Sequence, residues 1–101
     1  MALSPLVMAE FLLDAIARSH GVELWTARAE WHNGTPGCIA QPGKVIGGRR
    51  IFRLFDGPTG LPTVDYICYF AKGNLRAPLI FREHEIDSLP EKAERAIAEL
   101  K

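Results

Sequence analysis

The sequence has no net charge, because twelve Lys and Arg residues balance twelve Asp and Glu residues among its 101 positions. A chain without net charge has no overall attraction to nucleic acid or to anionic lipid. It also has no hydrophobic run that is long enough to span a bilayer. Residues 3–17 are rich in apolar side chains, but Glu10 and Asp14 interrupt them and no basic start precedes them. We therefore expect neither a membrane partner nor a targeting segment.

Cysteine is scarce: the chain has two, Cys38 and Cys68, and their spacing fits no metal-ligand motif. Cys68 stands in an apolar run and is expected to be a small buried side chain. Cys38 stands in a stretch rich in Gly and Pro and is expected to be more exposed. A domain of this length forms a core without a disulfide. We expect reduced thiols, one domain spanning residues 1–101, and a cytoplasmic setting.

Cofactor and metal motifs are missing as well. Residues 37–44 match a phosphate-binding loop only in part, because Gly37 and Gly43 are too far apart and Val45 replaces the required Ser or Thr. Carboxylates and a histidine crowd together in residues 83–87, but no distant ligand joins them. We expect a solvated acidic edge there, and we expect no cofactor, no metal and no catalytic residue.

What the sequence does have is two helical patterns, one at each end. Ser4 and Pro5 form a helix start, and Gly21 supplies a stop. The N-terminal helix is apolar around most of its circumference, apart from a polar stripe that contains Glu10 and Asp14. The C-terminal helix, residues 89–100, has a single apolar stripe. A capping box of Ser88 with Glu91 is expected to begin it.

Strand patterns lie between the helices. Residues 22–32, 49–56 and 63–71 alternate apolar and polar side chains, and a short strand is expected at 78–82. For residues 22–32 a helix is the alternative, because their alanines and their Glu and Arg content also tolerate one. Residues 33–48 are rich in Gly and Pro and predict a surface loop. The predicted fold is α+β, with a three- or four-stranded, mostly antiparallel sheet flanked by the two helices in the order α-β-β-β-(β)-α.

Apolar surface exceeds what one small sheet and two helices are expected to cover. Both faces of the central strands carry large side chains, and the N-terminal helix needs cover on more than one side. This surplus predicts a non-catalytic protein-interaction module, a small regulator or inhibitor that binds or masks a macromolecular partner. The partner can also be a second copy of the chain, bound through the N-terminal helix or the open sheet face. The partner-binding residues that we predict are Trp25, Trp31, Arg49, Arg50 and Arg53, because aromatic residues and arginine dominate binding energy at interfaces.

Two alternatives remain open. The basic segment 44–53 interleaves arginines with Phe52 and Phe55, a pattern typical of single-stranded nucleic-acid binding. The second alternative is a small thiol-dependent enzyme that uses Cys38 with a histidine as base. Its candidate bases are His20, His32 and His84.

Overall fold

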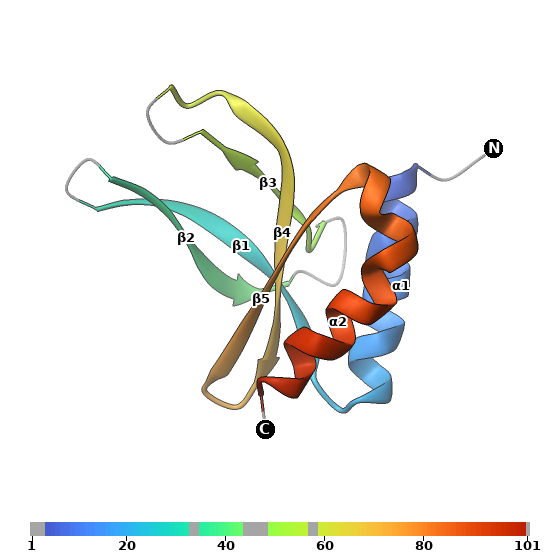
Figure 1. Ribbon diagram of the computed structural model, residues 1–101. Coiled ribbons are helices and arrows are strands. Elements are labelled where there is room, and N and C mark those ends of the chain that lie inside the picture. Colours follow the sequence, from blue (N-terminus) through green and yellow to red (C-terminus); the bar gives the residue numbers. More distant parts are fainter. Residues whose placement is uncertain (1–3, 33–34, 44–48, 57–58, 101) are drawn as a thin grey trace.

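The computed structural model describes residues 4–32, 35–43, 49–56 and 59–100. It contains two α-helices, five strands and a 3-10 helix (Figure 1). In chain order these are α1 (Pro5–Ser19), β1 (Glu23–His32), β2 (Thr35–Pro42), β3 (Phe52–Phe55), β4 (Pro62–Lys72), β5 (Leu75–Arg82), η1 (Glu83–Ser88) and α2 (Leu89–Ala98). All strand pairs are antiparallel, which confirms the predicted α+β layout.

Helix α1 begins and ends where the sequence predicts. The Ser4 hydroxyl accepts a hydrogen bond from the Val7 N–H at 3.2 Å, which satisfies one of the free donors at the helix start. Gly21 has φ 70, a left-handed conformation that favours glycine and turns the chain toward β1. Among the described residues, no helix has the length and apolar character needed to cross a membrane.

Strand β4 is the centre of the sheet. On one of its edges, β5 pairs with residues 65–72, and Gly73 at φ 58 forms the tight turn between the two strands. The other edge is shared by two strands, because β1 pairs with residues 69–71 and β3 pairs with residues 62–67. Strand β2 extends the sheet beyond β1. Two strands therefore leave the same edge of β4.

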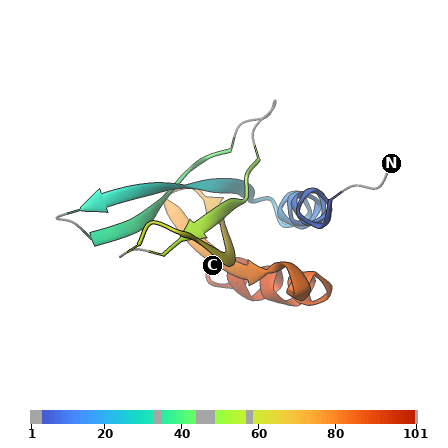
Figure 2. The same ribbon diagram turned by 90° about the horizontal axis from the view of Figure 1, so that it is seen from above.

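One hydrophobic core lies between the sheet and the two helices (Figure 2). Alternation along β4 directs Tyr66, Cys68 and Phe70 into this core, as their spacing predicts, and Phe70 and Cys68 are fully buried. The residues between them, such as Ile67 and Tyr69, point toward the face that the helices leave open. The core therefore anchors residues 69–71 of β4, where β1 pairs with this strand.

Two local predictions were wrong. Residues 35–42 form strand β2 rather than a surface loop, which raises the number of strands to five. Pro36 and Pro42 lie opposite Trp31 and Trp25 in the ladder with β1, and a strand admits proline where no N–H is needed for a ladder bond. The capping box at α2 is also absent, because Ser88 makes no cap hydrogen bond and donates to the Glu85 carbonyl instead.

Candidate functional site

The sheet divides into two arms where β1 and β3 leave the same edge of β4. One arm is the β1–β2 hairpin and the other is the β3–β4 hairpin, and both project away from the helices (Figures 1 and 2). Beyond Trp25 the ladder between β1 and β4 stops. The Tyr69 hydroxyl of β4 also donates to the Cys38 carbonyl of β2 at 3.5 Å, which links the two arms. The space between them is the candidate site.

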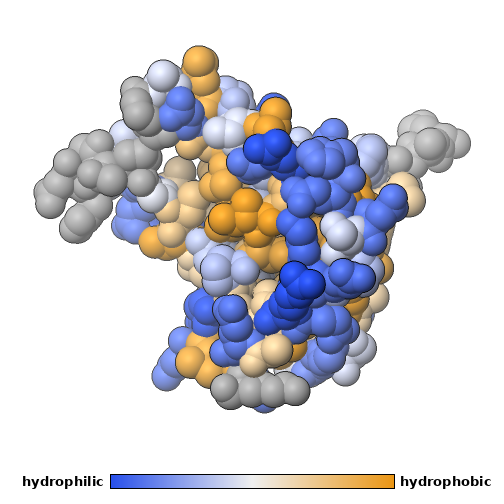
Figure 3. Space-filling model, viewed as in Figure 1, coloured by the Kyte–Doolittle hydropathy of each residue, from blue (hydrophilic) through white to orange (hydrophobic). Residues whose placement is uncertain are grey.

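A cleft of about 620 Å³ lies between the arms. We call it the fork cleft. Its main apolar lining comes from β1 on one side and from β3 and β4 on the other: Ala29, Trp31, Phe52, Phe55, Ile67 and Tyr69. In the space-filling view, hydrophobic side chains gather near the place where the arms diverge (Figure 3). The cleft is therefore an apolar hollow that is open to solvent.

The two predicted tryptophan anchors lie in different environments. Trp31 lines the fork cleft and is 61% exposed, and Phe55 across the cleft is 48% exposed. Trp25 is half-buried at the base of the fork, where the Arg76 guanidinium stacks over its ring at 3.8 Å. Its indole N–H donates to Glu23 at 2.7 Å. Trp31 has the free aromatic surface that an anchor needs, whereas the ring face and the N–H of Trp25 are engaged within the chain.

The three arginines that were predicted to bind a partner also lie in different environments. Arg49 is exposed and lines a smaller hollow of about 280 Å³ that shares Ala29 and Phe52 with the fork cleft. Arg50 is turned inward, since its main-chain N–H and its Nε donate to Glu10 at 3.1 and 3.3 Å and its guanidinium also pairs with Asp14. These contacts fix the chain that leads into β3 against α1.

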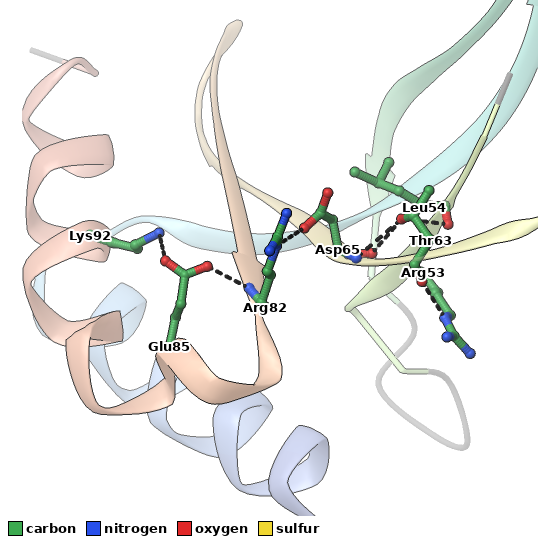
Figure 4. A network of polar contacts seen from close by, with 7 residues as sticks. All are labelled: Arg53, Leu54, Thr63, Asp65, Arg82, Glu85 and Lys92. Atoms are coloured by element: carbon green, nitrogen blue, oxygen red, sulfur yellow. Dashed lines mark hydrogen bonds and ion pairs between the residues drawn. The ribbon is translucent and has the colours of Figure 1, made fainter.

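Arg53 belongs to a chain of polar contacts that connects α2 with β3 (Figure 4). Its Nε donates to the Thr63 carbonyl at 2.8 Å, and the Thr63 hydroxyl contacts the Leu54 carbonyl. Farther along, Arg82 pairs with Asp65 at 2.9 Å. The Arg53 side chain is exposed and does not line the fork cleft.

That chain of contacts leads to Glu85, one of the acidic residues in the segment 83–87 before α2. Glu85 pairs with Lys92 at 2.6 Å and accepts the Arg82 main-chain N–H at 2.9 Å. The hydrogen bond from Lys92, with that from Arg82, lowers the pKa of Glu85. Among the described residues, no group of three or more His, Cys, Asp or Glu side chains is arranged to hold a metal ion.

Cys38 and two of its three candidate bases, His20 and His84, lie in different parts of the fold. Cys38 lies on β2 beside the fork cleft, and burial raises the pKa of its thiol, so it stays protonated at neutral pH. His20 pairs with Glu94 at 2.8 Å, which ties α1 to α2. His84 lines a separate hollow with Arg53, and the side chain of His32 lies outside the part of the chain that the structure describes. The thiol hypothesis stays a prediction from sequence.

Sequence reasoning missed the far wall of the cleft. Phe52, Ile67 and Tyr69 line it, and alternation already placed Ile67 and Tyr69 on the face opposite the core. That signal shows that these side chains share a face, but it does not show that the face is divided between two arms. The comparisons add no assignment: models of known protein families, curated proteins and solved structures were searched, and none matches this chain.

Proposed function

We propose that this chain is a non-catalytic protein-interaction module, a small regulator or inhibitor that binds and masks a macromolecular partner through the fork cleft. The observation that carries this proposal is the apolar cleft of about 620 Å³ with exposed aromatic side chains on both arms. Large exposed apolar patches on a small domain mark interaction sites. Aromatic side chains bury much area at a low entropic cost, which makes Trp31 and Phe55 the natural anchors.

The chemistry of the lining supports binding rather than catalysis. The described residues that line the cleft include two carboxylates, Glu30 and Asp56, and no histidine, lysine or arginine. The one thiol, Cys38, has a pKa raised by burial. A hollow that is mainly apolar, with a few charges at its margin, resembles the buried centre and polar rim of a protein interface.

The test uses the full chain and one matched pair of variants. Trp31→Glu places a charge in the fork cleft, whereas Phe11→Glu places the same charge on α1, where Phe11 is 65% exposed. We expect wild type and Phe11→Glu to capture the same protein from extracts of the native host, and Trp31→Glu to lose it. All three should unfold at similar temperatures. Equal capture by Trp31→Glu, or unfolding of that variant, would contradict the proposal.

A nucleic-acid-binding role is the second candidate, and the position of Arg49 favours it. Arg49 and Arg28 line the smaller hollow beside Phe52, so cationic groups lie next to an aromatic ring. Arg50 is engaged with α1, and Lys44 lies outside the described residues. Fluorescence anisotropy with labelled single-stranded DNA and RNA at low salt tests it. Binding that weakens in Arg49→Ala and with added salt would support this role, and no binding would exclude it.

Self-association stays a prediction. Helix α1 leaves Met8 and Phe11 more than half exposed, at 54% and 65%. Sedimentation of the wild type and of Phe11→Glu, recorded beside the capture experiment, separates a homodimer through α1 from binding through the fork cleft.

A further inference from the structure

Strand β1 presents main-chain hydrogen-bonding groups to the fork cleft. Trp25 lies opposite Pro42 and Trp31 lies opposite Pro36 in the ladder with β2. Proline has no N–H, so neither pair can exchange the two reciprocal bonds of a hydrogen-bonded pair. The bonds to β2 must therefore come from the alternate residues of β1, namely Thr26, Arg28 and Glu30.

The odd-numbered residues of β1 consequently direct their N–H and C=O groups away from β2. At Trp25 these groups meet β4, because Trp25 pairs with Tyr69. Beyond that pair the arms diverge, and among the described strands none pairs with Ala29 or Trp31 on this side. Ala27, nearer the base, is only 3% exposed and does not line the fork cleft, so the accessible edge begins at Ala29. The result is a short, unpaired strand edge that faces an apolar cleft. Such an edge is a template for the addition of another strand.

Charged side chains are unequally distributed along this edge. Glu30 and Asp56 line the fork cleft toward the ends of the two arms. Arg28 and Arg49 line the smaller hollow, which is shared with Ala27 at the base of the arms. A ligand that follows the edge of β1 would meet carboxylates at its outer end and guanidinium groups at its inner end.

We propose that the fork cleft binds an extended segment of a partner protein, which adds as a strand to the edge of β1. This inference rests on the proposed function and names the form of its ligand. The accessible edge, Ala29 to Trp31, covers three residues at about 3.3 Å each, which sets the shortest length of the bound segment. The segment has apolar side chains at alternate positions, a Lys or Arg at its outer end and an Asp or Glu at its inner end.

The probe is a displayed library of random peptides of about seven residues, selected on the folded full chain. We expect enriched sequences to alternate apolar and polar residues and to carry opposite charges at their two ends. Enrichment of apolar residues at helical spacing, or of none, would overturn the inference. Capture of a host protein through Trp31 would then still support the proposed function, so the two failures are distinguishable.

The decisive variant removes one cleft-facing N–H. Ala29→Pro deletes a donor on the free edge of β1 without removing a bond to β2. Ala40→Pro is its matched control, because Ala40 pairs with Ala27 and directs its own N–H to the outer edge of β2. We expect Ala29→Pro to bind the selected peptides at least about tenfold more weakly than Ala40→Pro.

A second measurement covers the case in which Ala29→Pro does not fold. The selected peptide is synthesised with N-methyl groups on alternate amides, in both registers, and measured against the wild-type chain. One register should lose binding by about tenfold or more, because a strand uses the N–H groups of alternate residues. Equal affinity for both registers and for the unmethylated peptide would overturn strand addition.

Discussion

At the scale of single residues, the ion pairs of α1 separate into a partly buried set and an exposed one. Arg50 is 23% exposed and contacts both Glu10 and Asp14, which are 18% and 16% exposed. Arg18 pairs with the same Asp14 at 3.1 Å but is 80% exposed. Charge-assisted hydrogen bonds shielded from water contribute more than surface pairs, so these two arginines differ in their effect on stability.

Arg50→Ala is expected to lower the free energy of unfolding by about 2 kcal/mol, because it leaves two partly buried carboxylates without their partner. Arg18→Ala is the control and should cost about 0.5 kcal/mol or less. Urea denaturation of the two variants measures both values. Equal losses would show that Arg50 does not hold the segment before β3 against α1.

Glu85 gives the molecule a specific dependence on pH. Its pKa is lowered in the folded state by Lys92 and by the Arg82 main-chain N–H. A carboxylate with a lowered pKa stabilises the fold above its ordinary pKa, and that contribution is lost as the pH falls through the folded value. The contribution is thus present at neutral pH and absent in strong acid.

Glu85→Gln should therefore be less stable than the wild type at pH 7, and the difference should shrink as the pH falls below the ordinary glutamate pKa of about 4.3. Unfolding curves across this range measure the difference. Glu91→Gln is the control, since Glu91 makes no ion pair with any described residue. A Glu85→Gln deficit that is constant with pH would contradict this account.

At the scale of helices and strands, an element can be predicted from sequence when contacts between neighbouring residues determine it. Ser4, Pro5 and Gly21 determine α1 through contacts within a few residues, and the helix has the predicted ends. The central strand β4 was likewise evident from its alternation. Strand β2 was not, because Gly37 and two prolines suppress the strand signal and only pairing with β1 makes the segment extended.

The N-cap of α1 provides a test of local stabilisation. Ser4→Ala removes the acceptor for the Val7 N–H and should cost about 1 kcal/mol in the free energy of unfolding. Ser19→Ala at the other end of α1 removes only an exposed hydrogen bond to the Ile16 carbonyl and should change stability by less than about 0.5 kcal/mol. Chemical denaturation compares them, and a larger loss for Ser19→Ala would contradict the assigned cap.

At the scale of the whole molecule, the candidate site depends on pairing between distant segments. The sequence predicted Trp31 as an anchor because aromatic residues dominate the binding energy at interfaces. It could not predict the fork cleft, since the cleft exists only because β1 and β3 share one edge of β4. For the same reason the sequence did not show that Arg50 meets Glu10, forty positions away. Register between strands and long-range ion pairs are properties of the assembled fold.

The most direct measurement of the central claim is residue-resolved amide hydrogen exchange of the free chain by NMR. The N–H groups of Thr26, Arg28 and Glu30 should exchange slowly because β2 accepts them, whereas those of Ala29 and Trp31 should exchange fast. A selected peptide should then slow the second set. Slow exchange of all five in the free chain would show that the edge of β1 is already paired, and this would contradict the account.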